Sequence, residues 1–118
     1  MRRDDARLLD MLLAAQDAVM FVSSLTREAF DGDRKTQYAV SRALEIVGEA
    51  ASKVTDDTRE RHPDIPWSRI VGMRTFLAHE YFQIDLDAVW SVITTQLESL
   101  IGQLKAIVPP EASQSERS

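Results

Sequence analysis

The sequence predicts an all-α protein, folded as an antiparallel bundle of four to five helices. Apolar residues recur at helical spacing in four separate segments, and no segment shows the sustained alternation that is typical of a β-strand. Glycines, prolines and residues that commonly cap helices stand between these segments. These observations together favour helices that pack side by side, each through one apolar face.

A single domain is expected, because 118 residues suit one core and leave no room for a second. We expect this domain to span residues 1–108. The polar end of the chain, residues 109–118 with the sequence PPEASQSERS, is expected to be a disordered tail.

The first two long helices are predicted over residues 4–23 and 34–54, with a short helical turn at residues 27–30 between them. The two acidic residues at positions 4 and 5 suit a helix N-terminus. Gly48 lies on the apolar face of the second long helix, among alanines. It would let another helix or a second copy of the chain approach closely. It can equally be a glycine that the helix tolerates at a cost of ~1 kcal/mol.

Two prolines, Pro63 and Pro66, separate the second long helix from the third. Residues 58–62 before them are expected to form at most a turn or two. Pro66 suits the first position of the third helix, which is predicted from residue 67 to about residue 79. The fourth helix is predicted to begin after Asp85 as N-cap and to run to residue 107. Its apolar residues follow a 4-3 spacing that is typical of a bundle seam: Leu86, Trp90, Ile93, Leu97, Leu100, Leu104 and Ile107.

The composition argues against several classes of protein. The chain has no cysteine and only two histidines, so we expect no disulfide, no metal site and no cofactor. The sequence has no secretory apolar region and no run near the ~18 apolar residues of a membrane span, so we expect a cytoplasmic protein. The net charge of −5 weighs against a broad basic face for nucleic acid. A local basic cleft remains compatible with it, and residues 59–74 are the most basic stretch.

Three residues on the third helix suggest chemistry. Arg74, His79 and Tyr81 lie within eight residues. On an ideal helix, His79 lies about 140° round and ~7.5 Å along from Arg74, so the two side chains do not meet well. Two arrangements remain open. Either the helix ends near His79 and turns the imidazole round, or a second copy of the chain lies alongside, so that a homodimer forms the site.

An arginine near a histidine, without metal ligands around them, suits the handling of a phosphodiester. Arginine binds phosphate oxygens through a planar fork of donors, and histidine moves a proton near neutral pH. Those two functions suffice for RNA cleavage by the neighbouring 2′-hydroxyl without a metal. Thr75 could orient a water or that hydroxyl. By spacing alone, a lone arginine and histidine at a helix end are more often surface or interface residues.

Two segments resemble the HepT-like proteins of the HEPN superfamily. They are residues 65–90, IPWSRIVGMRTFLAHEYFQIDLDAVW, and residues 34–50, RKTQYAVSRALEIVGEA. The motif of that family, R-x4-6-H-x-Y, is met in full by Arg74, His79 and Tyr81. Many HEPN ribonucleases carry Asn or Asp directly after the motif arginine, where this chain has Thr75. The resemblance covers most of the chain, to about residue 108.

The resemblance implies a HEPN-type bundle that dimerises, with Arg74 and His79 of both chains lining one cleft. It implies a metal-independent ribonuclease that acts on RNA as the toxin of a HepT/MNT toxin–antitoxin pair, with Arg74 and His79 catalytic and Thr75 auxiliary. The partner would be an MNT-type nucleotidyltransferase antitoxin, which silences the toxin by transferring AMP from ATP onto Tyr81. The alternatives are a non-catalytic subunit that binds nucleotide or the nucleotidyltransferase, and a plain helical dimerisation domain.

Overall fold

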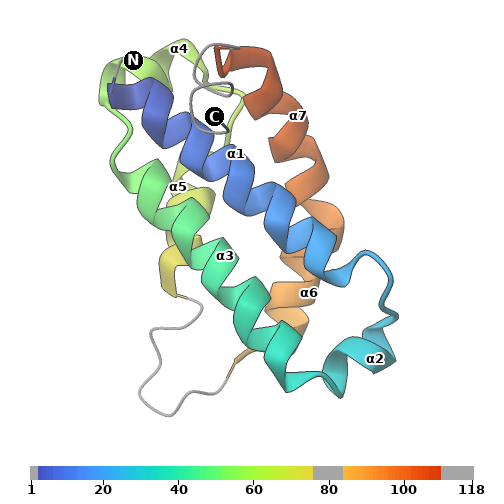
Figure 1. Cartoon of the computed structure of the whole chain (residues 1–118). Helices are drawn as coiled ribbons and strands as arrows, with labels where there is room; N and C mark the ends of the chain where they lie inside the picture. Colours follow the sequence, from blue (N-terminus) through green and yellow to red (C-terminus); the bar gives the residue numbers. More distant parts are fainter. Residues whose placement is uncertain (1–2, 76–83, 110–118) are drawn as a thin grey trace.

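The computed structural model of the chain describes residues 3–75 and 84–109. These residues form seven α-helices and one 3-10 helix, and none of them forms a strand, which confirms the all-α prediction (Figure 1). None of the helices in these two ranges is both long and apolar enough to cross a membrane. In chain order the elements are α1 (Arg3–Val22), α2 (Arg27–Asp31), α3 (Arg34–Ser52), α4 (Asp56–Arg61), α5 (Trp67–Val71), η1 (Gly72–Thr75), α6 (Leu86–Thr95) and α7 (Leu97–Ile107).

The rods of an antiparallel bundle are formed by α1, by α3, by α5 with η1, and by α6 with α7 (Figure 1). α1 packs against α3 on one side and against α7 on the other, and α5 with η1 packs against α3. α6 and α7 follow one another along one edge of the bundle and make the fourth rod. α2 and α4 are short helices at the two ends. The arrangement is the bundle that the apolar periodicity predicted, while the predicted dimer stays a prediction.

The core lies between α1, α3 and the α6–α7 rod. Met11, Leu44, Val47, Leu97 and Leu104 are all fully buried there. The predicted seam of the fourth rod is therefore confirmed over α7, where each third or fourth residue faces the other helices. α2 closes one end of this core through the ring of Phe30, whose centroid lies 5.1 Å from that of Trp90 in α6.

Four helices begin at a side chain that caps the first free backbone amides. Asp85 accepts a hydrogen bond of 3.0 Å from the amide of Ala88, which confirms the predicted start of α6. Thr55 caps α4 in the same way, so this helix begins two residues earlier than the turn expected at residues 58–62. The other two caps are Thr26 for α2 and Asp33 for α3.

The predicted fourth helix is divided in two at Gln96, which corrects the continuous helix expected to residue 107. Thr94 and Thr95 donate hydroxyl hydrogen bonds of 2.8 Å and 2.6 Å to the carbonyls of Trp90 and Ser91. Back-bonding of this kind bends helices, and β-branched residues also lower helix propensity. Gln96 accordingly departs from helical geometry, with φ −120° and ψ −36°, before α7 continues the apolar seam.

The predicted third helix is not α-helical throughout its described residues, 67–75. It is α-helical over α5 and then tightens into the 3-10 helix η1 at Gly72. Glycine has a low helix propensity, and 3-10 turns are frequent where α-helices end. Pro66 stands at the N-cap of α5 and not at its first helical position. Residues 76–79 of the predicted helix, and residues 110–118 of the predicted tail, lie outside the described residues.

Candidate active site

η1 carries Arg74 and Thr75, the two candidate site residues that the structure describes. Buried side chains anchor η1 and the helix before it: Met73 of η1 and Trp67 of α5 are 3% and 8% exposed. The Trp67 indole donates a hydrogen bond of 3.0 Å to the carbonyl of His62, which ties the turn before α5 to the helix itself. The exposed side chains of Arg74 and Thr75 therefore project from an element with a well-packed base.

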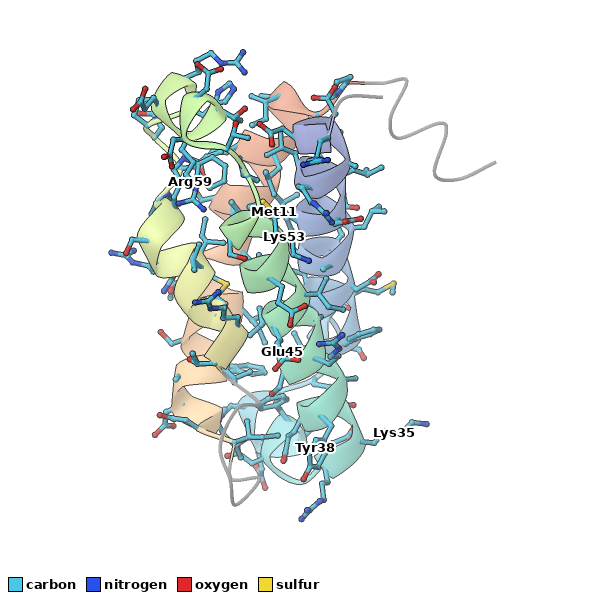
Figure 2. All side chains as sticks on the ribbon, turned by 90° about the vertical axis from the view of Figure 1, so that its left-hand side faces the viewer. Met11, Lys35, Tyr38, Glu45, Lys53 and Arg59 are labelled. Carbon is cyan, nitrogen blue, oxygen red and sulfur yellow. The ribbon has the colours of Figure 1, made fainter. Side chains whose placement is uncertain are left out.

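Two of the four arginines in the basic stretch, residues 59–74, have partners within the protein. The guanidinium of Arg59 lies 6.0 Å from the ring centroid of Trp67 and donates a hydrogen bond of 2.9 Å to a carbonyl near the end of α3 (Figure 2). Arg61 forms an ion pair of 3.3 Å within α4. Arg69 and Arg74 are exposed and form no ion pair within residues 3–75 and 84–109. The two arginines of the stretch without an ion pair among the described residues are therefore those on α5 and η1.

The guanidinium of Arg74 has no hydrogen bond or ion pair with any of the described residues. An acidic residue, Glu45, lies on α3 one helical turn before Gly48, and its side chain is only 16% exposed. Its carboxylate is paired with Arg42 on the same helix and not with Arg74. Among the described residues, the five N–H donors and the positive charge of Arg74 are therefore not neutralised, which suits the binding of a phosphate group.

The hydroxyl of Thr75 donates a hydrogen bond of 2.9 Å to the carbonyl of Gly72, within the same 3-10 turn. The single hydroxyl proton is thereby used inside η1, and the oxygen keeps its acceptor capacity. In this conformation Thr75 can orient a water or a ribose hydroxyl only by accepting a hydrogen bond from it.

Gly48 faces the backbone of η1, which decides between the two interpretations of this glycine. A Cβ atom at position 48 would lie 2.4 Å from the amide nitrogen of Arg74 and 3.0 Å from the carbonyl oxygen of Val71. The close approach predicted from the small residues of this face therefore occurs within one chain, between α3 and η1. Helical periodicity places Gly48 on a packing face but does not identify the element that packs there.

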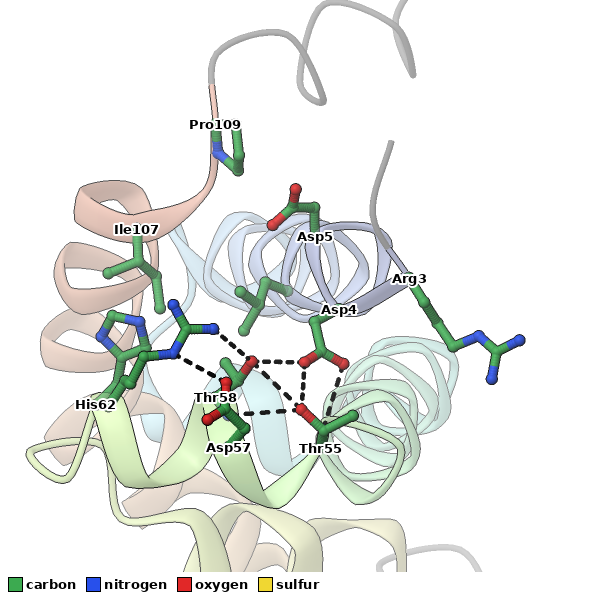
Figure 3. A pocket seen from close by; sticks show the side chains of 11 residues that line it. Arg3, Asp4, Asp5, Thr55, Asp57, Thr58, His62, Ile107 and Pro109 are labelled. Carbon is green, nitrogen blue, oxygen red and sulfur yellow. Dashed lines mark hydrogen bonds and ion pairs between the residues drawn. The ribbon is translucent and has the colours of Figure 1, made fainter.

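Two cavities among the described residues are lined by other side chains than those of Arg74 and Thr75. The larger, of about 610 Å³, is at the end of the bundle where the N-terminus of α1 meets α4 and the end of α7 (Figure 3). His62 lines this cavity, so the second histidine of the chain lies at the bundle end and not on η1. A smaller cavity of about 210 Å³ lies between α5 and the junction of α6 with α7. Neither lining includes Arg74 or Thr75.

His79 and Tyr81 lie outside the described residues, so their positions relative to Arg74 stay predictions. In the part of the chain that the structure describes, no three or more His, Asp and Glu side chains are grouped so that they could hold a metal ion.

Comparison with known proteins identifies a family for this chain. Residues 11–107 match the family model described as "Ribonuclease HepT-like". A protein of Thermococcus cleftensis named "Probable ribonuclease HepT" is 37% identical over an alignment of 102 residues that covers 83% of this chain and 93% of that protein. A protein of Methanocaldococcus jannaschii named as a "Putative RNase" is 34% identical over 102 residues, or 86% of this chain and 94% of that protein. No solved structure matches the chain significantly.

Proposed function

The chain belongs to the HepT-like ribonuclease family, and we propose that it is a metal-independent endoribonuclease, the toxin of a toxin–antitoxin pair. The observation that carries this proposal is the family match, which spans residues 11–107 and so includes all of α3, α5 and η1. The exposed side chain of Arg74, which forms no ion pair with residues 3–75 or 84–109, supports it, because a phosphodiester needs a cation that is not already neutralised.

In the proposed reaction, Arg74 binds the non-bridging oxygens of the scissile phosphate. The ribose 2′-oxygen attacks phosphorus and loses its proton to a base, the bond from phosphorus to the 5′-oxygen breaks, and the leaving 5′-oxygen takes up a proton. His79 acts as the base or as the acid in these proton transfers. The products are a 2′,3′-cyclic phosphate and a 5′-hydroxyl. Thr75 would help to orient the 2′-hydroxyl by accepting its hydrogen bond.

The proposed regulation acts on Tyr81. An MNT-type nucleotidyltransferase antitoxin would direct the Tyr81 phenol oxygen onto the α-phosphorus of ATP, releasing pyrophosphate and leaving AMP on the tyrosine. The new phosphodiester carries a negative charge and would compete with the RNA backbone for Arg74. Such a charge acts as a local switch in the way that phosphorylation does.

The first test measures RNA cleavage in EDTA by purified protein whose intact mass shows that Tyr81 is unmodified. Wild type is compared with His79→Ala, and His62→Ala serves as the matched control because His62 lies in the cavity at the end of the bundle. We expect cleavage by wild type and His62→Ala, with 2′,3′-cyclic phosphate ends, and none by His79→Ala. Equal cleavage by all three proteins, or none by any of them, would refute the ribonuclease proposal in favour of a non-catalytic subunit.

The second test examines AMP transfer with the nucleotidyltransferase and ATP, using intact mass and peptide mapping. The chain offers a matched control in its other tyrosine, Tyr38, whose hydroxyl accepts a hydrogen bond of 3.1 Å from Arg34. Tyr81→Phe should block the addition of AMP, whereas Tyr38→Phe should be modified like wild type. Modification of Tyr81→Phe at another residue would contradict the assignment.

A third test asks whether the site is shared between two chains. Arg74→Ala and His79→Ala are mixed under conditions that allow subunits to exchange. If each site combines Arg74 of one chain with His79 of the other, every mixed dimer holds one complete site, and roughly a quarter of wild-type activity returns. If both residues come from the same chain, no mixed dimer holds a complete site and the mixture stays inactive.

A further inference from the structure

We propose that Gly48 is a positioning residue for Arg74: the absence of a side chain at position 48 lets the backbone of η1 lie directly on α3, and this contact sets where the Arg74 guanidinium stands. The inference rests on the proposed function, since Arg74 is taken as the residue that binds the scissile phosphate. It concerns a residue on another helix, which acts on the site only through the backbone.

The three atoms nearest to a Cβ built at position 48 are all backbone atoms. A Cβ at position 48 would lie 2.4 Å from the amide nitrogen of Arg74, 3.1 Å from its Cα and 3.0 Å from the carbonyl oxygen of Val71. Backbone atoms cannot rotate aside as the end of a side chain can. Any larger residue at position 48 must therefore push η1 away from α3.

Two other glycines provide a comparison inside the same chain. A Cβ at Gly72, in η1 itself, or at Gly102, in α7, would have no atom within 4 Å apart from its immediate surroundings in the chain. The requirement for glycine is thus local to the crossing of α3 and η1. It is not a general property of the glycines in this bundle.

Among the described residues, no hydrogen bond or ion pair holds the guanidinium of Arg74, so its position depends on the backbone that carries it. Ile70 of α5 and Met73 of η1 are 1% and 3% exposed and belong to the core, so this backbone is packed against the bundle. A displacement of about 1 Å at a residue that positions a reacting group costs roughly 100-fold in rate. A shift of η1 should therefore lower catalysis without unfolding the bundle.

The experiment compares Gly48→Ala with Gly102→Ala, which adds the same methyl group to a helix where nothing opposes it. RNA cleavage is measured at saturating and at low RNA concentrations, which give kcat and kcat/KM. The folded fraction of each variant is measured by circular dichroism at the same temperature. Backbone ¹H–¹⁵N signals of Val71, Arg74 and Thr75 report the position of η1. We expect Gly48→Ala to move these signals and to lower kcat by roughly 10- to 100-fold. Gly102→Ala should change neither.

A double variant separates positioning from a general loss of structure. If Gly48 acts through Arg74, then Gly48→Ala should lower the residual cleavage of Arg74→Lys by much less than it lowers that of wild type. A loss of folded protein would instead lower both by the same factor. Should Gly48→Ala fail to fold, Met73→Ala loosens η1 without a steric overlap, and the same comparison in the Arg74→Lys background applies to it.

The outcomes distinguish this inference from the proposed function. If wild type cleaves RNA and Gly48→Ala cleaves it equally fast, the role of Gly48 is refuted and the ribonuclease proposal stands. The same conclusion follows if Gly48→Ala lowers cleavage by the same factor in wild type and in Arg74→Lys. Absence of cleavage by wild type, together with shifted signals in Gly48→Ala, would refute the proposed function and reduce the contact to a packing feature.

Discussion

The carboxylate of Asp4 joins the start of α1 to the start of α4, and its removal should destabilise the protein. Asp4 accepts hydrogen bonds from the amide of Thr55 at 3.2 Å, from the hydroxyl of Thr55 at 2.6 Å and from the hydroxyl of Thr58 (Figure 3). The partners are more than 50 residues away along the chain. Asp4→Ala removes all three contacts and leaves the Thr58 hydroxyl, which is 3% exposed, without its charged acceptor.

The expected cost follows from these bonds. A hydrogen bond to a charged group contributes about 1.5–3 kcal/mol when it is buried. Asp4 is only half-buried, so solvent competes for its oxygens and the sum over the three bonds is smaller than three times that value. We expect Asp4→Ala to lower the free energy of unfolding by about 2 kcal/mol near neutral pH. For a chain of this size that corresponds to a fall in Tm of roughly 8 °C.

The effect should depend on pH in one direction. The hydrogen bonds from Thr55 and Thr58 lower the pKa of Asp4 in the folded state below its ordinary value. A lowered folded pKa means that the unfolded chain binds the proton more readily, so the stabilisation is complete above the unfolded pKa of about 3.9. It is lost as the pH falls below about 4 and through the folded pKa.

The assay is urea denaturation of wild type and Asp4→Ala between pH 7 and pH 3. Asp17→Ala is the matched control, because Asp17 is an exposed aspartate on the same helix. The difference between wild type and Asp4→Ala should be largest at pH 7 and shrink toward acid, while Asp17→Ala should stay within about 0.5 kcal/mol of wild type. A difference that is absent at pH 7, or that grows as the pH falls, would refute this account of the contact.

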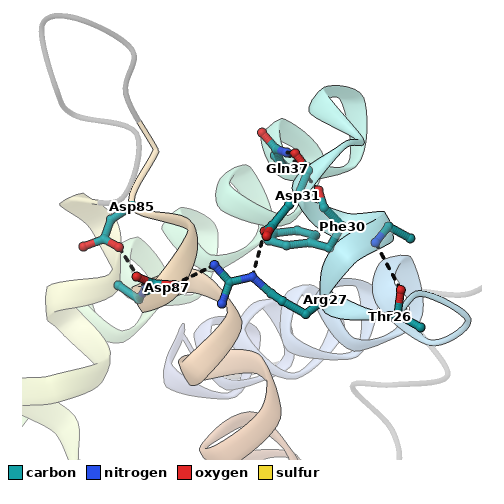
Figure 4. Close-up of polar contacts among 9 residues, drawn as sticks. Thr26, Arg27, Phe30, Asp31, Gln37, Asp85 and Asp87 are labelled. Atoms are coloured by element: carbon teal, nitrogen blue, oxygen red, sulfur yellow. Dashed lines mark hydrogen bonds and ion pairs between the residues drawn. The ribbon is translucent and has the colours of Figure 1, made fainter.

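Three further predictions concern packing, helix propensity and surface charge. Phe30→Ala should lower the free energy of unfolding by about 3–5 kcal/mol in urea denaturation, because the fully buried ring leaves a cavity beside α6; a smaller change would mean that the core closes over the gap. Gly102→Ala should raise stability by roughly 1 kcal/mol in the same assay, and a loss would contradict the open space around it. Arg27 forms an ion pair of 2.6 Å with Asp87 of α6 (Figure 4). Arg27→Ala should lower Tm at low salt and leave it unchanged in 1 M salt, because salt screens an exposed ion pair. A fall in Tm that persists in 1 M salt would contradict this.

Local sequence information was sufficient where the interacting groups are close along the chain. Asp85 was predicted as an N-cap because such a cap binds an amide only three residues ahead, and this bond is present. The break at Gln96 was missed because two local signals compete there. The 4-3 apolar spacing predicts one helix, whereas the hydroxyls of Thr94 and Thr95 bond to the preceding turn and bend it.

The candidate site was predictable in part. Arg74 and Thr75 lie exposed on one short element, as a site on the third helix requires, although that element is a 3-10 helix. The hydroxyl of Thr75 bonds to the carbonyl three residues before it, as the hydroxyl of Ser52 does in the α-helix α3, so this bond is compatible with either kind of helix. The roles of His79 and Tyr81 stay predictions.

The sequence by itself determined the helical class, the approximate positions of the helical segments and the family. Apolar periodicity, caps and motifs each involve residues that are close together along the chain. Only the tertiary structure decided that Gly48 meets the backbone of Arg74 and that Asp4 meets Thr55. A helical pattern states which face of a helix is buried, but it does not state which element covers that face. That choice depends on how all the helices fill one core together, and in this chain it also determines where Arg74 stands.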